Sequence, residues 1–159
     1  MADQEKSTLI VFSGDLDKAI ASFIIATGAA AMGKQVTMFF TFWGLNILRK
    51  EEYVNVNKSF LDKMFGLMMP RGPEKLGLSK LNMGGLGAKL MKRVMKKKNI
   101  SSLKELMDLA QELDIKLVAC TMSMDALGMA KEELIDGLEY AGVASYLNDA
   151  QDAKVNLFI

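Results

Sequence analysis

Short apolar runs and longer amphipathic stretches follow one another along this chain, in an order typical of strands that alternate with helices. Short runs of β-branched and apolar residues predict strands, and longer stretches with apolar positions three and four apart predict helices. The predicted strands are residues 8–12, 35–41, 115–119, 137–140 and 154–159, and the predicted helices are residues 16–32, 101–113, 123–129, 131–134 and 143–149. This order favours a five-stranded, mainly parallel sheet with helices on both faces.

Two of these helices have clear boundaries in the sequence. Residues 16–32 are apolar almost all round and end at Gly33, which predicts a helix buried against the sheet and a neighbour such as another subunit. Ser101 or Ser102 caps the helix of residues 101–113, and Glu105 completes a capping box.

Residues 50–100 interrupt the alternation with a Met-rich and Gly-rich insert. Phe60, Met64, Leu67 and Met68 lie at helical spacing, the motif Pro70-Arg71-Gly72-Pro73 breaks the chain, and residues 76–87 read as a loop. Methionine suits adaptable contact surfaces, so the insert is a candidate for partner docking or oligomer contact.

The insert ends in a basic amphipathic helix, residues 88–98. Cations occupy one face and apolar residues the other; the cations are Lys89, Lys92, Arg93, Lys96 and Lys97, and the apolar residues are Leu90, Met91, Val94 and Met95. Such a helix can lie on a membrane surface, bind an acidic partner, or simply cover its own core with a solvated face. The pattern leaves these three alternatives open.

Length and composition narrow the class of protein. The chain has 159 residues, 50% of them hydrophobic and 25% charged, which predicts one globular domain spanning residues 1–159. A net charge of +1 offers no general field for nucleic acid. Residues 1–6 lack the apolar core of a signal peptide, and no apolar run is long enough for a membrane span. A lone unpaired cysteine favours a reducing compartment, so we expect the cytoplasm.

The chemical inventory excludes several kinds of site. The chain has no histidine and one cysteine, which excludes Cys-His and Ser-His-Asp catalysis, His-bearing zinc sites, CxxC redox chemistry and iron–sulfur ligation. We therefore expect no metal and no cofactor. The turn Ser13-Gly14-Asp15 between strand and helix resembles a phosphate loop, but Asp15 and Asp17 place negative charge where a phosphate would bind. Their ordinary role is helix capping.

Cys120 is the candidate functional residue. It ends the predicted strand of residues 115–119, and ligands of open α/β sheets bind beyond the carboxyl ends of the strands. A helix starting near Ser123 or Asp125 would point backbone N–H groups towards the sulfur, and we expect solvent to reach it there. The alternative is that Cys120 acts as a small buried hydrophobe, which is common for free cysteines.

A second cluster of residues is expected at the same edge of the sheet. The aromatic turn Thr41-Phe42-Trp43-Gly44-Leu45 follows the second predicted strand, and the turn containing Gly14 follows the first. We expect Gly14 and Trp43 to line a pocket, with Trp43 covering the thiol. The alternative is that this lone tryptophan fills the core.

Four segments carry a resemblance to a known family. They are Phe39-Phe40-Thr41-Phe42-Trp43-Gly44-Leu45, Leu78-Ser79-Lys80-Leu81-Asn82-Met83, Ala119-Cys120-Thr121-Met122-Ser123-Met124-Asp125, and the end of the chain from Asp136-Gly137 to Leu157-Phe158-Ile159. The chain resembles the DsrE/DsrF-like family, in the branch with a long mid-chain insert. The resemblance implies a three-layer, flavodoxin-like α/β/α fold, homo-oligomers, and a sulfur relay in which the motif cysteine, here Cys120, carries sulfur as a persulfide.

The chemistry and the resemblance lead to one functional hypothesis and two rivals. The hypothesis is a sulfurtransferase-like carrier in which Cys120 takes sulfane sulfur from a donor and passes it to an acceptor thiol. The backbone N–H groups of Thr121, Met122 and Ser123, with the two hydroxyls, would stabilise the anionic sulfur. One rival is a non-catalytic adaptor that docks on a membrane or redox complex through residues 88–98. The other is a peroxide sensor, for which the usual Pro and Thr context before the cysteine is missing.

Overall fold

The short runs of β-branched and aromatic residues form five strands of one sheet in the computed structural model, which describes residues 4–159. Residues 1–3, part of the polar start that argues against a signal peptide, lie outside this description. Every strand pair is parallel, and the order is β4-β3-β2-β1-β5. The strands are β1 (Lys6–Val11), β2 (Gln35–Phe40), β3 (Lys116–Cys120), β4 (Glu139–Ala141) and β5 (Ala153–Phe158). The predicted five-stranded parallel sheet is confirmed.

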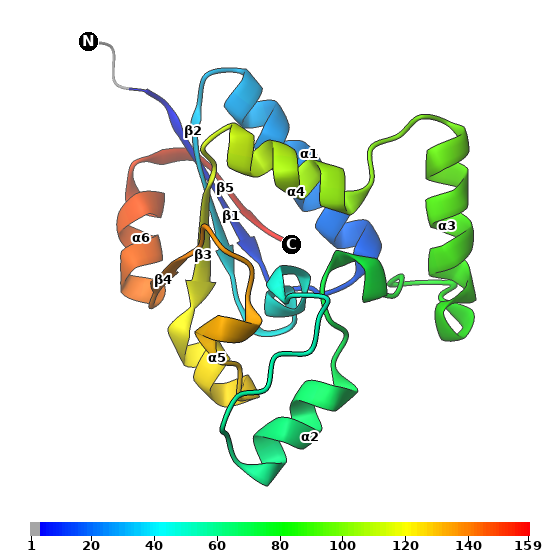
Figure 1. The fold of residues 1–159 in the computed structure, drawn as a ribbon. Helices are drawn as coiled ribbons and strands as arrows, with labels where there is room; N and C mark the ends of the chain where they lie inside the picture. The colour runs from blue at the N-terminus through cyan, green and yellow to red at the C-terminus, as the bar shows by residue number, and fades with distance from the viewer. Residues whose placement is uncertain (1–3) are drawn as a thin grey trace.

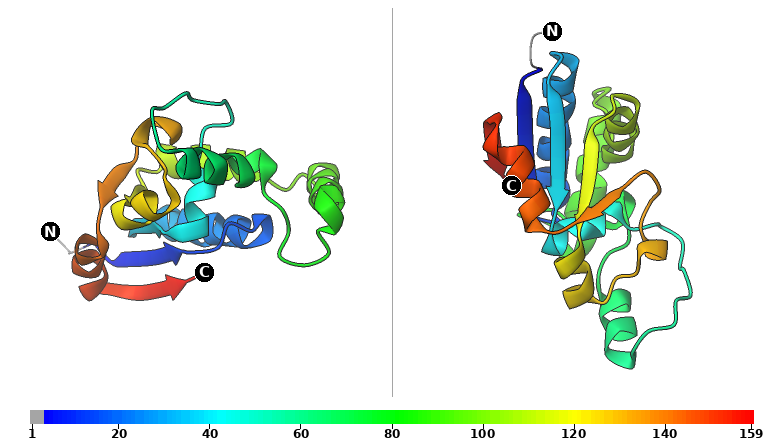
Figure 2. Two further views of the ribbon diagram at one scale, coloured as in Figure 1. Left: turned by 90° about the horizontal axis from the view of Figure 1, so that it is seen from below. Right: turned by 90° about the vertical axis from the view of Figure 1, so that its left-hand side faces the viewer.

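Helices cover both faces of the sheet, which gives the predicted three-layer α/β/α fold (Figure 1 and Figure 2). The helices α1 (Leu16–Ala31) and α4 (Leu103–Glu112) lie on one face, and α6 (Val143–Gln151) lies on the other. Side chains alternate along β1, so that Leu9 and Val11 enter the core under α1 while Thr8 faces α6. The Tyr146 hydroxyl of α6 lies 3.1 Å from the Thr8 hydroxyl.

The helix boundaries follow the sequence signals closely. Ser102 caps α4 by accepting from the Glu105 N–H at 3.2 Å, and the Glu105 carboxylate accepts from the Ser102 N–H at 2.7 Å. The capping box is therefore confirmed. Helix α1 packs against the sheet as expected, and Ile24 and Ile25 remain exposed in the single chain, so its expected second neighbour stays a prediction.

The insert contains two helices that extend from the layered body (Figure 1). They are α2 (Phe60–Met68) and α3 (Leu86–Lys97), and two short 3-10 turns, η2 (Pro73–Lys75) and η3 (Met83–Gly85), lie between them. All six large apolar side chains of α2 are exposed: Phe60, Leu61, Met64, Phe65, Leu67 and Met68. None of the helices within residues 4–159 is both long enough and apolar enough to cross a membrane.

A buried arginine attaches the first half of the insert to the body. Arg49 is 2% exposed, and its guanidinium donates to the Gly66, Met69 and Pro70 carbonyls at 3.0–3.2 Å. These carbonyls lie at the C-terminal end of α2, where backbone acceptors lack helical partners. Burial, together with the nearby Arg71, lowers the pKa of Arg49, and Glu133 opposes this shift.

Backbone contact between the ends of β1 and β2 requires glycine at position 44. A Cβ on Gly44 would lie 2.0 Å from the Val11 carbonyl oxygen, and the Gly44 N–H already donates to the Phe12 carbonyl at 2.8 Å. We expect Gly44→Ala to lower the free energy of unfolding by about 3 kcal/mol or more, because the backbone itself must move. Urea unfolding followed by circular dichroism measures the change.

Gly28→Ala is the matched control, because a Cβ on Gly28, which is within α1, meets nothing within 4 Å. We expect this variant to gain up to about 1 kcal/mol, since alanine favours a helix interior over glycine. Equal stability of the two variants would contradict the close approach at Gly44.

Candidate functional site

Cys120 lies at the carboxyl end of β3, as the sequence predicts. It is the last residue of the strand and pairs with Ala141 of β4, while Phe39 and Phe40 of β2 pair with Val118 and Ala119. The sheet therefore brings the end of β3 beside the end of β2. Because side chains alternate along a strand, Cys120 shares the face of Val118, which is the face covered by α6.

The surroundings of the thiol are apolar. Cys120 is only 3% exposed and belongs to a small buried cluster with Phe39, Val118 and Tyr146. The Phe39 and Tyr146 rings are 5.1 Å apart and form part of the cover over this face. The expectation that solvent reaches the sulfur at the sheet edge is therefore wrong for the single chain in this structure. The sequence pattern did not reveal this cover, because it does not show which side of α6 meets which strand.

The helix after Cys120 begins earlier than expected. It is α5 (Thr121–Leu127), and Cys120 itself takes the N-cap position, so the expected caps Ser123 and Asp125 lie inside the helix. The N–H groups of Thr121, Met122 and Ser123 belong to the first turn, where backbone donors have no partner within the helix.

The side chains of this turn differ in their surroundings. Thr121 is half-buried and Met122 is exposed, whereas Ser123 is fully buried. The Ser123 hydroxyl lies 2.7 Å from the Thr41 hydroxyl, so one of the two expected hydroxyl donors is already engaged with the end of β2. This hydrogen bond fixes α5 against the turn that follows β2.

Gly14 and Trp43 do come together, in a hollow of about 370 Å³ beyond the ends of β1 and β2. A Cβ on Gly14 would lie 2.6 Å from the Trp43 carbonyl oxygen, so glycine permits this approach. Trp43 is 45% exposed, which shows that it does not fill the core. Cys120 is not among the residues that line the hollow, so the covering of the thiol by Trp43 stays a prediction. The hollow adjoins the start of α1, whereas Cys120 faces α6.

Two features were not expected from the sequence, one in this hollow and one beside it. Asn46 lines it, is 3% exposed, and its Oδ1 atom has no hydrogen-bond partner among the described residues. Phe42 has a φ of 46°, in the left-handed region that a bulky residue rarely adopts. Its ring packs 5.6 Å from that of Phe12. The sequence carries no local signal that would predict the unpartnered side chain of Asn46 or the left-handed backbone of Phe42.

The charged side chains of β3 and of the start of α1 are engaged with other groups. Lys116, at the opposite end of β3, donates to Asp149 at 2.9 Å and lies 3.4 Å from Glu139. The Asp149 hydrogen bond raises the pKa of Lys116 against the effect of burial. The Asp15 carboxylate contacts the Ser13 hydroxyl and Lys18. The Asp17 carboxylate accepts a hydrogen bond from Ser79. Within residues 4–159 no three Cys, Asp or Glu side chains are arranged to hold a metal ion.

Comparison with known proteins shows which family the chain belongs to. The model of the DsrE/DsrF/DrsH-like family matches residues 3–158, which is nearly the whole chain. The chain belongs to the DsrE/DsrF/DrsH-like family. The resemblance of the four sequence segments to this family is therefore confirmed.

Two relatives of this DsrE-like chain align over its full length. Protein YrkE of Bacillus subtilis is 58% identical over 160 residues and covers 100% of both chains. The sulfur carrier protein DsrE2 of Allochromatium vinosum is 40% identical over 161 residues and covers 99% of both chains.

Two solved structures share the DsrE-like fold at low sequence identity. The ychN protein of E. coli has a TM-score of 0.55 at 9% identity, over 97% of this chain and 99% of that one. MTH1491 of Methanobacterium thermoautotrophicum has a TM-score of 0.57 at 11% identity, over 98% and 100%. At this identity the likeness shows the fold alone.

The buried position of Cys120 in this DsrE-like chain predicts slow alkylation. We expect a maleimide to modify the native thiol far more slowly than the thiol in urea, because the cover must open first. Tyr146→Ala removes part of the cover and should accelerate modification by about tenfold or more. Intact-mass measurement over time gives the rates.

Met107→Ala is the control, since Met107 of α4 packs in the core of the opposite face. It should change the rate by less than about threefold after correction for stability. Rapid alkylation of the native wild-type protein would contradict the burial of Cys120.

Proposed function

We propose that this protein is a sulfur carrier in which the Cys120 thiolate accepts sulfane sulfur as a persulfide and passes it to an acceptor thiol. The partners are a donor and an acceptor, each a protein or a small thiol. The reducing cytoplasm is the proposed compartment, because it keeps a lone thiol free for exchange.

The transfer is written as two thiol exchanges that balance without an oxidant. In the first, the Cys120 thiolate attacks the outer sulfur of a donor persulfide, a new S–S bond forms, the donor S–S bond breaks, and the donor thiolate leaves. In the second, an acceptor thiolate attacks the outer sulfur of the Cys120 persulfide and releases the Cys120 thiolate. The first-turn N–H groups of Thr121, Met122 and Ser123 are the proposed donors to the anionic sulfur.

One observation carries the proposal: the only cysteine of the chain ends a central parallel strand directly before a helix. Ligands of open α/β sheets bind at this edge. A full-length relative with 40% identity is named a sulfur carrier protein, which supports the same role here. Absence of histidine also fits, because persulfide exchange needs a thiolate and not an imidazole base.

Burial of the thiol means that transfer needs an opening step. The proposed route is the corner between β4 and α6, which borders Cys120 through Ala141 and Tyr146. β4 has three residues and lies at the edge of the sheet, so few backbone hydrogen bonds hold it. Gly142 joins the two elements, and a Cβ there would meet nothing within 4 Å. Opening of this corner would expose the sulfur, and in the main core under α1 it would loosen the contact made by Tyr140 of β4.

Sulfur loading tests the proposal directly. We expect wild-type protein incubated with glutathione persulfide to gain one sulfur atom, read by intact mass, and to lose it when a small thiol is added. Cys120→Ser should gain none. Urea-unfolded wild type, which exposes the thiol, is the positive control for the reagent. Loading of the unfolded chain without loading of the native chain at any donor concentration would overturn the carrier proposal.

We also propose that the protein forms homo-oligomers. The Phe12 ring stacks 5.7 Å from the Phe158 ring, and Phe158, on the edge strand β5, is 67% exposed. An aromatic surface beside an open strand edge favours contact with another chain. The exposed Ile24 and Ile25 of α1 offer a second surface of this kind.

The oligomer is tested by analytical ultracentrifugation. We expect wild type to sediment as an oligomer and Phe158→Asp to shift towards the monomer, because a charge in that contact would lose hydration without a partner. Leu113→Asp, at an exposed residue at the end of α4, is the matched control and should sediment as wild type. Monomeric wild type across the accessible concentration range would remove this proposal.

A second candidate function is favoured by the burial of Cys120. In this alternative the thiol is only packed, and the protein is a non-catalytic adaptor that binds through its insert. The sulfur-loading experiment separates the two functions: an adaptor keeps an unmodified thiol in the native state, whereas a carrier is loaded.

A further inference from the structure

The charges of this chain are sharply segregated. Residues 75–104 contain nine basic residues and no aspartate or glutamate; the basic residues are Lys75, Lys80, Lys89, Lys92, Arg93, Lys96, Lys97, Lys98 and Lys104. All 19 acidic residues therefore lie elsewhere, together with the remaining eleven basic residues. The net charge of +1 is therefore the sum of a strongly positive segment, residues 75–104, and a negatively charged remainder of the chain.

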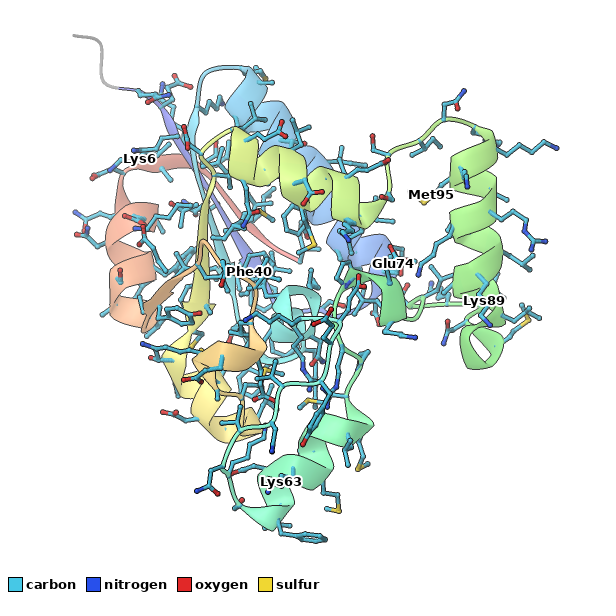
Figure 3. All side chains as sticks on the ribbon, in the orientation of Figure 1. Lys6, Phe40, Lys63, Glu74, Lys89 and Met95 are labelled. Carbon is cyan, nitrogen blue, oxygen red and sulfur yellow. The ribbon has the colours of Figure 1, made fainter. Side chains whose placement is uncertain are left out.

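The positive segment is centred on α3, which stands apart from the layered body in Figure 1 and in the left view of Figure 2. Only Gly87, Ala88 and Met95 of this helix are buried. Figure 3 shows Met95 on the side of α3 that faces α4. Lys92 pairs with Glu74 at 3.2 Å, and within residues 4–159 it is the only cation of the segment with an acidic partner.

The outer side of α3 carries two parallel stripes. Leu86, Leu90 and Val94, spaced by four, are 55%, 47% and 46% exposed. Lys89, Arg93 and Lys97 each lie three residues after one of these apolar positions, so the cations run directly beside the apolar stripe. Leu81 and Met83 extend the exposed apolar surface into the loop before the helix.

We infer that α3 is a peripheral membrane-binding helix that lies on an anionic lipid surface. The apolar stripe enters the boundary between headgroups and acyl chains, and the adjacent cations meet the anionic headgroups. Long lysine side chains suit this position, because their stems cover apolar surface while their charges stay at the polar level.

The residue types favour lipid over a protein partner. Protein interfaces are enriched in aromatic residues and depleted in lysine, and α3 contains four lysines and no aromatic residue. A second copy of this chain is also less suitable. Many body carboxylates already pair with body lysines, as Glu133 does with Lys58 at 2.8 Å and Asp149 with Lys116 at 2.9 Å.

Vesicle sedimentation with the full chain tests the inference. The probes are vesicles of phosphatidylcholine alone and vesicles with about one third phosphatidylglycerol. We expect the protein to pellet with the anionic vesicles only, and to be released when salt rises from about 0.05 M to about 0.5 M, because salt screens the attraction.

Two pairs of variants separate charge from apolar insertion. Lys89→Gln, Arg93→Gln and Lys97→Gln combined should weaken binding by roughly 100-fold. The same loss of charge on the body, at Lys18, Lys131 and Lys154, should weaken it less than about fivefold. Leu90→Ser with Val94→Ser should weaken binding about tenfold. Leu109→Ser with Leu113→Ser, exposed positions with the same spacing at the end of α4, should leave binding unchanged. Circular dichroism checks that each variant is folded.

Several results would overturn the inference. Equal pelleting with neutral and anionic vesicles, or full binding by the α3 charge variant, removes the electrostatic contact. Full binding by the Leu90 and Val94 variant removes the insertion. Absence of vesicle binding together with α3-dependent binding of polyglutamate assigns the surface to an acidic protein, and α3-dependent self-association assigns it to a second copy. Cys120→Ser should bind vesicles as wild type does, so this test is independent of the carrier proposal.

Discussion

The hydrogen-bonded ladder between β2 and β3 determines where the single thiol lies. Phe39 pairs with Val118 and Phe40 with Ala119, so the two strands end side by side and Cys120 emerges next to Thr41. The Thr41–Ser123 hydroxyl pair then holds the first turn of α5 at this point. A shift of one residue in this register would move the sulfur to the opposite face, under α1 instead of α6. The backbone pairing of β2 with β3 thus determines on which face of the sheet the sulfur lies.

The two halves of the insert are held by different forces. The first half is fixed by buried charge: Arg49 binds three carbonyls around the end of α2, and Lys58 pairs with the buried Glu133. Removing one partner from such an arrangement leaves an uncompensated charge, so these contacts specify one position for the segment. The second half, α3, is held mainly by Met95, Ala88 and one ion pair with Glu74. It therefore presents its outer side without a tertiary cover.

Much of the fold could be predicted because local signals and global structure agree. The strands are short β-branched runs, Gly33 follows the end of α1, and the Ser102–Glu105 capping box is visible in the sequence. The remaining features depend on contacts between distant residues. Arg49 is buried only because carbonyls 17 to 21 residues later reach it. The cover of Cys120 depends on Tyr146, and the period of two along β3 does not show which face α6 occupies. The left-handed Phe42 has no local sequence signal at all.

The separation of α3 from the β4–α6 corner has a consequence for how the molecule operates. In Figure 1 and in the left view of Figure 2 these two features lie at opposite ends of the body. The positive end and the negative body also form a large electric dipole, which turns the molecule in the field of a charged surface before contact. A chain tethered by α3 would keep the corner beside its thiol pointing away from that surface. Anchoring and exchange with passing proteins would then not compete for the same space.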